Sequence, residues 1–434
     1  METKRTLGKS ISRRDMLKAI GVGMAGTALA ACAPAQATTA PVKNTEVSAQ
    51  PPAPQQVEIT MLSHIYEPWN NALSASAMQY MGGNNNVKIV YSYIPHADLN
   101  TKIVTALASG NAPTIMGVYG PWMPQLVNGG NLSAADGDII SDLDANFPAV
   151  MKEAATYSGK VYGYVQHIGI PIPIINQELY DAAGMKPPTT YDELAAVNSK
   201  LDQKDGNDWK QFGTTLTTTK AGSWNVIHFS AILFAQGGSF LSDDLSKATF
   251  NSEEGASAAK IYQTLAHPEA PSDAFVLGKT AMVCDGPWAK SGYAATAPNL
   301  KYKAILPLKG AKAQVTGSYV WFWTVSSKAT LDQQAAAWQY LKWLSGPEQY
   351  ASIYRNVGLL PITKTLPAEL AKDEWAQTFS QALNFSKIYY AKHAAWEKID
   401  VAIGEEMERY AAKEITDKEF LGNAETKVNA ILKG

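Results

Sequence analysis

The stretch that most constrains the fold is an extended, apolar segment in the middle of the chain, from Gly159 to Asn176. Its Val, Ile and Tyr residues favour strands, whereas Pro171 and Pro173 exclude a helix and argue against an ordinary central strand. After Asn176 comes a short helical pattern that stops at Gly184. We interpret the segment as a crossover between two lobes.

A second helix signal follows the crossover. Two prolines break the chain, and Thr190 with Glu193 then forms a capping-box pattern. The order strand, Asn, short helix, Gly, Pro-Pro and capped helix resembles the crossover of the extracellular solute-binding proteins of ABC importers, the large family 1 that includes the maltose-binding type. One departure is that this family usually has aromatic residues just before the Asn, where this chain has Ile174 and Ile175.

The most diagnostic run extends from Phe275 to Trp288. It matches the Phe-x-x-Gly-Lys-x-Ala-Met signature of this family, followed by a short strand and Gly-x-Trp, at every named position. Gly278 permits a tight turn, and Gly286 with Pro287 allows the chain to break after the strand. Trp288 is therefore expected to project from a strand end.

The resemblance covers nearly everything from Val57 to the C-terminus. A length of 434 residues also exceeds what one hydrophobic core usually holds. The expected fold is α/β, two-lobed and periplasmic-binding-protein-like (type II), with a ligand cleft between the lobes and two interlobe crossovers, the second within 316–328. The expected bounds are 57–167 with 320–366 for lobe 1, and 168–319 with 367–434 for lobe 2.

The pattern of residues 1–31 predicts an export signal rather than part of the folded domain. Arg13 and Arg14 form a twin-arginine pattern before an apolar run, which ends in Leu-Ala-Ala-Cys32 and resembles the lipobox of bacterial lipoproteins. Cys32 would then be diacylated and become the mature N-terminus. The alternatives are an ordinary signal with a chance Cys, an uncleaved anchor, and general export, because Met16 stands where such signals often carry Phe. Residues 32–56 are rich in Ala, Pro, Thr and Gln and predict a flexible tether.

A single substitution tests the predicted anchor. We expect Cys32→Ser to abolish membrane anchoring and to leave the protein soluble outside the cytoplasm, because two acyl chains provide an attachment that one chain cannot. Detergent partitioning of the wild type and the variant measures this. Unchanged partitioning into the detergent phase would contradict the prediction.

Composition narrows the type of ligand. A net charge of −2 gives no electrostatic reason to expect nucleic acid or an acidic surface as a partner. The six His are scattered without metal-site spacing, so we expect no metal and no cofactor, and Cys284 is expected to be an inert buried thiol. The chain has 11 Trp and 20 Tyr, several of them at strand ends. Aromatic faces stack on sugar rings while polar neighbours bind the hydroxyls, which indicates a carbohydrate site.

The candidate ligand-binding residues follow predicted strands or lie in the crossovers. For each aromatic side chain the alternative is core packing, and for the two polar residues of the first crossover it is a hinge role with backbone hydrogen bonds. Asp285 is the best candidate to accept a hydroxyl. The full set is His64, Tyr66, Glu67, Trp69, Tyr119, Trp122, Gln166, His167, Trp224, Asp285, Trp288, Tyr319, Trp321 and Trp396.

Two functions from different classes remain. The favoured one is a monomeric receptor, lipid-anchored to the outer face of the cell membrane, that captures a mono- or oligosaccharide by hinge closure and delivers it to an ABC permease. The alternative is a secreted glycosidase or polysaccharide lyase. Adjacent acids such as those at 243–244 and 405–406 lie in contexts that face different ways, whereas a glycosidase needs two converging carboxylates. A binding protein that feeds a sensor is a third possibility.

Overall fold

The structure is a computed structural model that describes residues 56–216, 222–360, 362–364 and 370–434. Cys32, the twin-arginine pair and nearly all of the predicted tether lie outside the described residues. In the described part of the chain, no helix combines the length and the apolar character needed to cross a bilayer.

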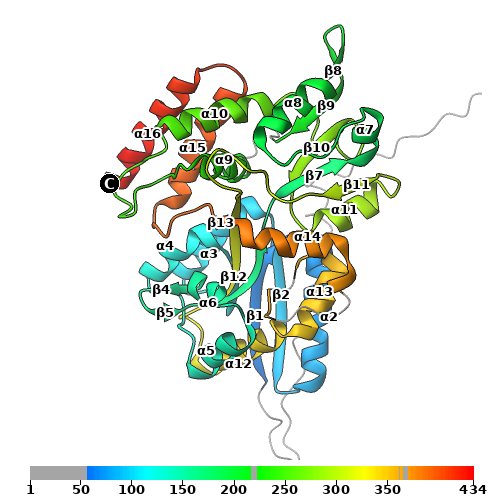
Figure 1. The fold of residues 1–434 in the computed structure, drawn as a ribbon. Helices are drawn as coiled ribbons and strands as arrows, with labels where there is room; N and C mark the ends of the chain where they lie inside the picture. The colour runs from blue at the N-terminus through cyan, green and yellow to red at the C-terminus, as the bar shows by residue number, and fades with distance from the viewer. Residues whose placement is uncertain (1–55, 217–221, 361, 365–369) are drawn as a thin grey trace, which may run out of the picture. The chain divides into compact units, whose positions relative to one another are not determined.

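The first of two large sheets is mixed and contains strands from the beginning of the described chain together with two later strands (Figure 1). Its strand order is β13-β12-β3-β1-β2, and β6 also pairs with β12. Strand β1 runs parallel to β2 and β3, whereas β12 runs antiparallel to β3 and β6. The strands are β1 (Val57–His64), β2 (Val87–Ile94), β3 (Ile115–Tyr119), β6 (Tyr164–Gly169), β12 (Thr316–Val325) and β13 (Ser386–Ile388). A separate small pair is formed by β4 (Thr156–Tyr157) and β5 (Lys160–Val161).

A second sheet has the order β11-β7-β10-β9-β8. Its strands are β7 (Ile172–Asn176), β8 (Gln203–Asp205), β9 (Asp208–Thr215), β10 (Thr280–Asp285) and β11 (Tyr302–Ala304). The expectation that the prolines keep this segment out of a central strand is wrong for β7, which lies between β11 and β10. Pro173 is tolerated there because its carbonyl accepts from Ile305 N (2.9 Å), just beyond the last residue of β11, where no ladder bond needs its missing N–H.

Helices surround both sheets. Beside the first sheet, α13 packs on α2, while α12 packs on β1 and α3 also contacts β1. Beside the second sheet, α8 contacts β9 and α10, and α14 contacts β11. The first group comprises α2 (Glu67–Gly83), α3 (His96–Ala108), η1 (Gly120–Trp122), α4 (Met123–Asn128), α5 (Gly137–Asn146), α6 (Ala149–Ala154), α12 (Leu331–Leu344) and α13 (Pro347–Val357). The second comprises α7 (Gln177–Ala182), α8 (Tyr191–Leu201), α9 (Ser223–Gln236), α10 (Glu253–Leu265), α11 (Ala289–Thr296), η2 (Leu370–Lys372), α14 (Glu374–Ala382), η3 (Leu383–Phe385), α15 (Trp396–Ala411) and α16 (Asp417–Lys433).

Most of the capping and turn signals around the first crossover are confirmed. Asn176 caps α7 through Leu179 N, and the side chain of Thr190 caps α8 through Glu193 N. The reciprocal half of the capping box differs, because the Glu193 carboxylate accepts from the N–H and hydroxyl of Thr189, one residue earlier than expected. The break between β6 and β7 falls at 170–171, as the first proline requires.

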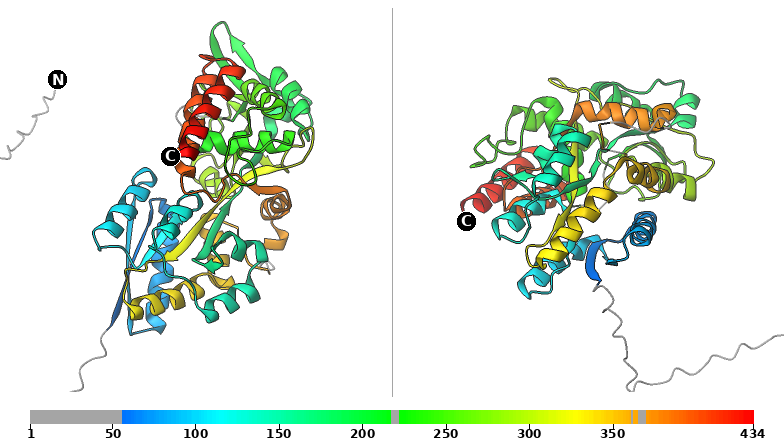
Figure 2. Two further views of the ribbon diagram at one scale, coloured as in Figure 1. Left: turned by 90° about the vertical axis from the view of Figure 1, so that its left-hand side faces the viewer. Right: turned by 90° about the horizontal axis from the view of Figure 1, so that it is seen from below.

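Strand β12 belongs to the first sheet along its whole length. Its residues 321–325 pair with β3, while residues 316–318 pair with β13. The chain passes from the first sheet to the second between β6 and β7, and returns between β11 and β12. A third passage, which the sequence analysis did not predict, joins α13 beside the first sheet to α14 beside the second. In Figure 2 (left), β12 is the yellow strand that runs from one sheet toward the other. Both crossovers named in the sequence are therefore extended segments.

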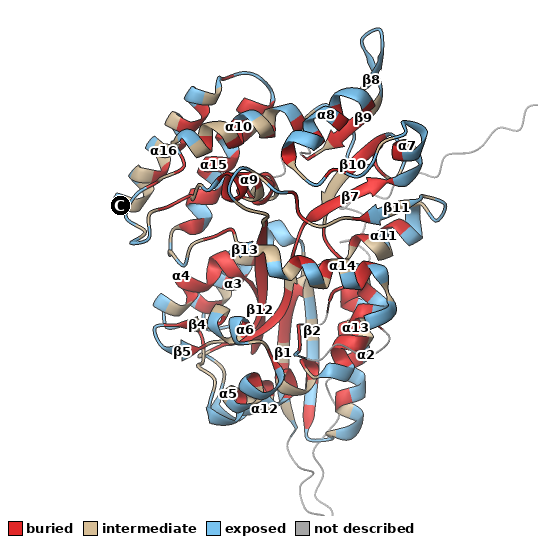
Figure 3. Ribbon diagram, in the orientation of Figure 1, coloured by how far each residue is buried: buried red, intermediate tan, exposed pale blue. Residues whose placement is uncertain are grey.

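Three of the strands are completely buried and form part of the core. Every residue of β12 is buried, and β3 and β7 are buried along their whole length (Figure 3). Helix α9 packs on β12 at Gly317, where a Cβ would meet Ser230 Oγ and would lie only 2.8 Å from the carbonyl oxygen of Ile227. The absence of a side chain at Gly317 thus sets how closely α9 approaches β12.

This close approach can be tested with Gly317→Ala. We expect an overpacking cost of about 1–3 kcal/mol in the free energy of unfolding, since the backbone of α9 must move. The measurement is urea unfolding. Gly292→Ala, in α11, is the matched control, because a Cβ there meets no atom within 4 Å and should leave stability unchanged or slightly raised. Equal stability of the two variants would contradict the packing argument.

Candidate ligand-binding site

A cavity of about 690 Å³, here called the ligand cavity, lies where the ends of first-sheet strands meet α9. Most of the residues predicted from the sequence line it, namely His64, Tyr66, Trp69, Tyr119, His167, Trp224, Trp288, Tyr319 and Trp321. They come from segments far apart in sequence. His64, His96 and Tyr119 lie at or just after the carboxyl ends of β1, β2 and β3, where open α/β sheets bind ligands.

One wall of the cavity is built on β12. Antiparallel pairing places Trp321 opposite His167 of β6, and the two rings stack with centroids 6.2 Å apart. His64, at the end of β1, lies 4.6 Å from Trp321 between ring centroids. Trp323, two residues further along the strand, is buried and stacks on Trp69, with centroids 6.1 Å apart. The period-two alternation of a strand thus puts a row of aromatic rings on this wall.

The opposite wall comes from α9 and from the loop after β10. Trp224 lies 6.2 Å from Trp288 and 6.3 Å from Tyr319 between ring centroids. Trp288 follows the Gly-Pro break after β10, and its indole ring folds over Gly286 so closely that a Cβ there would collide with it. The glycine of the Gly-x-Trp motif is thus required by the position of the ring.

The histidines of the cavity are neutral at physiological pH. Burial, with a smaller contribution from His96, lowers the pKa of His64 to about 4. Burial, and then the proximity of His64, lowers the pKa of His167 to about 3. Burial also lowers the pKa of His96. Among the described residues that line the cavity there is no Asp, Glu, Lys or Arg, so its hydrogen-bonding groups are uncharged.

Several polar atoms of the cavity residues keep their hydrogen-bonding capacity. In the described chain, His64 Nδ1, His167 Nδ1 and Trp69 Nε1 are buried and have no protein partner. Buried polar groups are normally paired. These three atoms therefore have hydrogen-bonding capacity that no described protein group uses.

Three of the predicted polar residues do not line the cavity. Glu67 is exposed in the first turn of α2. Gln166 is the extra residue of a bulge in β6, since His167 pairs with Trp321 while Val165 pairs with Phe322. The bulge leaves its amide buried and without a partner in the described chain, and aims His167 at the cavity instead.

Asp285 lies in a neighbouring pocket of about 250 Å³ rather than in the ligand cavity. Its carboxylate accepts from Gly286 N (2.7 Å) and Tyr293 OH (3.4 Å), and burial raises its pKa to about 6. Trp224 lines both spaces. Cys284 also lines this pocket and is a free thiol whose pKa burial raises to about 12.

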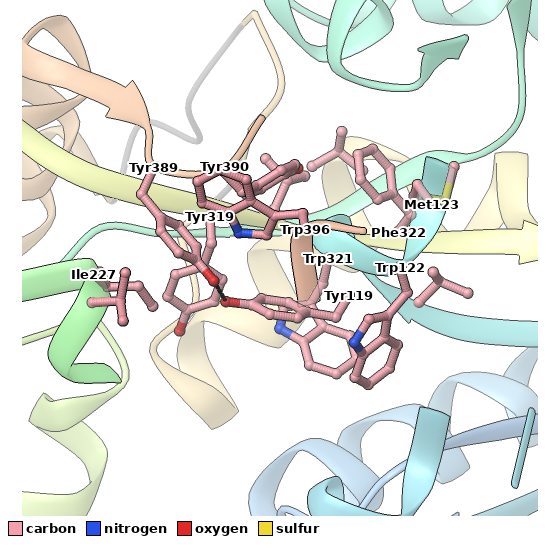
Figure 4. Close-up of a cluster of buried hydrophobic side chains, with 14 of the residues drawn as sticks. Tyr119, Trp122, Met123, Ile227, Tyr319, Trp321, Phe322, Tyr389, Tyr390 and Trp396 are labelled. Atoms are coloured by element: carbon pink, nitrogen blue, oxygen red, sulfur yellow. Dashed lines mark hydrogen bonds between the residues drawn. The ribbon is translucent and has the colours of Figure 1, made fainter. Parts of the chain in front are cut away.

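Two of the candidate tryptophans, Trp122 and Trp396, do not line the cavity. Figure 4 shows both in the buried aromatic cluster that also holds Trp321 and Tyr119. Trp122 contacts the ring of Trp321 with centroids 5.7 Å apart and supports the wall. Trp396 begins α15, is fully buried, and packs on Phe240 and Tyr389. Core packing is thus the role of Trp396 in this structure, and its polar sequence neighbours reflect the outer face of α15.

The cavity is also lined by residues that the sequence analysis did not predict. His96 follows β2, so the rule for strand ends could have identified it. Ser223 opens α9 directly before Trp224. The remaining lining residues have no distinctive sequence signal and are Ile65, Ala97, Gly222, Ile227 and Leu359.

Comparison with known proteins identifies the family. The model of the family described as bacterial extracellular solute-binding protein matches residues 75–379. This chain belongs to that family. This chain is 24% identical over 319 residues to the maltotriose-binding protein of Pyrococcus abyssi. The match covers 71% of this chain and 67% of that protein. This chain is also 24% identical to the erythritol/L-threitol-binding protein of Mycolicibacterium smegmatis, covering 90% of each chain.

Solved structures agree with the predicted fold class. An ABC substrate-binding protein from Listeria monocytogenes, solved in complex with cycloalternan, superimposes on the solute-binding protein with a TM-score of 0.76 at 23% identity. The match covers 87% of this chain and 99% of that one. The two-lobed α/β fold expected from the sequence is thus confirmed.

Trp288 and Trp396 offer a matched pair for testing the site. We expect Trp288→Ala to weaken ligand binding by about 2 kcal/mol or more, as loss of a buried aromatic anchor does. Trp396→Ala should leave affinity largely unchanged but cost about 3–5 kcal/mol of stability, as core truncations do. Calorimetric titration and thermal unfolding of both variants measure these effects. A large loss of melting temperature with unchanged affinity in Trp288→Ala would contradict the site.

Proposed function

We propose that this solute-binding protein captures a neutral carbohydrate in the ligand cavity and delivers it to the permease of an ABC importer. The observation that carries the proposal is the chemistry of the cavity. Aromatic rings form both walls, and the polar groups between them are neutral imidazole, indole and hydroxyl groups.

These groups match the two surfaces of a sugar. The C–H faces of a pyranose or polyol stack on indole and phenol rings, while its hydroxyl edges bind nitrogen and oxygen atoms. A charged solute would find no countercharge among the described lining residues. The volume of about 690 Å³ accommodates a mono- or short oligosaccharide.

The relatives support the same class of ligand. Proteins similar to this chain are named for maltotriose and for erythritol or L-threitol, and similar solved structures hold cycloalternan or ribitol. All of these are uncharged, hydroxyl-rich molecules.

The mechanism would be closure of two lobes about the crossovers. We take the lobes as 57–167 with 320–366 and 168–319 with 367–434, since α13 packs on α2 while α14 packs on β11. A ligand held by Trp321 on one side and Trp224 and Trp288 on the other contacts both lobes only when they are closed. Binding therefore stabilises the closed state by the energy of the contacts that only this state makes.

We further propose the cellular setting that the sequence indicates. The protein would be exported, anchored by lipid at Cys32 to the outer face of the membrane, and monomeric. A permease docking with the closed form would receive the sugar. Attachment through the tether would keep the receptor near that permease.

A secreted carbohydrate-active enzyme is the alternative. Its mechanism would require two carboxyl groups on either side of a sugar bond. Asp285, the acid that directly precedes the Gly-Pro-Trp288 loop, lines the neighbouring pocket and not the ligand cavity. This arrangement favours binding without turnover.

A ligand screen tests the proposal directly. Maltotriose, maltose, mannobiose, erythritol and ribitol are compared with glucuronate and glucosamine by thermal shift, because a ligand that binds only the native state raises its melting temperature. We expect stabilisation by a neutral compound and little by the charged pair. Small-angle scattering with the best compound should show a smaller radius of gyration.

Two outcomes would overturn the proposal. Stabilisation by the charged sugars alone would contradict a neutral ligand. Consumption of a bound neutral sugar over hours, abolished by Asp285→Asn while binding persists, would favour the enzyme.

A further inference from the structure

A buried carboxyl group lies directly behind the wall of the ligand cavity. Asp400, on α15, is only 2% exposed. Its Oδ2 accepts hydrogen bonds from the hydroxyl of Ser223 and from that of Tyr389, the latter at 3.1 Å. Tyr389 OH in turn lies 2.9 Å from Tyr119 OH, the contact drawn as a dashed line in Figure 4. Ser223 and Tyr119 line the cavity, whereas Asp400 and Tyr389 lie behind it.

The direction of these hydrogen bonds is determined by counting hydrogens. A hydroxyl group has one hydrogen to donate and lone pairs that accept. Because Tyr389 donates to Asp400, Tyr119 must be the donor in its bond with Tyr389. Ser223 also donates to Asp400. Both hydroxyls of these cavity residues therefore use their hydrogen behind the wall, and only lone pairs remain for any further hydrogen bond.

The same chain of contacts joins the two sides of the cavity. Tyr119 ends β3 of the first sheet. Ser223 opens α9 and Asp400 lies on α15, and these two helices pack on each other. One carboxylate thus holds a cavity hydroxyl from each side.

We propose that Asp400 is a positioning residue of the ligand cavity, which through Tyr389 holds Tyr119, and directly holds Ser223, as hydrogen-bond acceptors for ligand hydroxyls. The inference rests on the proposed function, since it specifies how that site selects hydroxyl donors. A ligand group that cannot donate a hydrogen, such as an ether oxygen, would be disfavoured at these two positions.

The charge of Asp400 sets the strength of this arrangement. Burial raises its pKa to about 7, while the bonds from Ser223 and Tyr389 act in the opposite direction. The ionisable side chains that interact with Asp400 in the described chain are Glu397, Tyr119 and Tyr389. Because a carboxylate is a stronger acceptor than a neutral carboxyl group, the hydroxyls are held more firmly as the pH rises through this range.

The first arm of the test needs no ligand. Tyrosine labelled with ¹³C at Cζ is observed by NMR from pH 5 to 9, and the signals are assigned by their loss in Tyr119→Phe and Tyr389→Phe. We expect both signals to titrate together with the ionisation of Asp400 in the wild type. In Asp400→Asn, a nearly isosteric change, that titration should vanish. Its persistence in Asp400→Asn would overturn the proposal.

The second arm measures affinity for maltotriose by calorimetry. Asp400→Asn should weaken binding at pH 8 by about tenfold, the effect of one lost oriented hydrogen bond, and should remove the rise in wild-type affinity between pH 6 and pH 8. Ser223→Ala should show a similar loss. Glu406→Gln is the matched control, since Glu406 is an equally buried acid on α15 that pairs with Lys427 and Arg409 away from the cavity.

The outcomes for Asp400 and for the proposed function can be distinguished. An equal loss in Asp400→Asn and Glu406→Gln would reduce Asp400 to a structural residue of α15 and overturn its positioning role. If the wild type binds neither maltotriose nor any other sugar of the screen, the proposed function fails. In that case the NMR titration alone decides whether Asp400 controls the two tyrosines.

Discussion

The antiparallel pairing of β12 with β3 and β6 is the interaction on which the rest of the structure depends. It places Trp321 opposite both Tyr119 and His167, which creates one cavity wall in a single register. A shift of one residue would turn these side chains to the other face of the sheet. The same strand packs on α9 at Gly317, so the position of the second wall, carried by Trp224, depends on it as well.

The chemistry of the cavity follows from burial at this junction. Enclosed imidazoles lose their charge because a charged ring would have to leave water, and the lowered pKa values of His64 and His167 express that cost. The groups left to bind a ligand are neutral and directional. Selectivity would then come from the placement of donors and acceptors, and the Asp400 network is the means by which the protein would fix two of them.

Much of the fold could be predicted from local signals. Strand ends marked by aromatic residues, the Gly-x-Trp run and the capped helices lie where the sequence placed them, because turns, caps and alternation depend on near neighbours in the chain. Errors arose where a distant partner decided the outcome. Pro173 is accommodated in an internal strand because β11 ends beside it.

The sequence by itself determined the family and, through that resemblance, the fold class. It also placed aromatic residues at predicted strand ends, because such motifs are local. Only the tertiary structure decided which side chains meet. Gln166 turns away and His167 turns in because of a bulge against β12, and Trp396 is core while Trp288 is not. Asp400 gave no signal in the sequence, since the hydroxyls that it holds come from segments brought together only when α9, α15 and β3 pack against one another. Contacts between distant segments depend on packing, which no local pattern encodes.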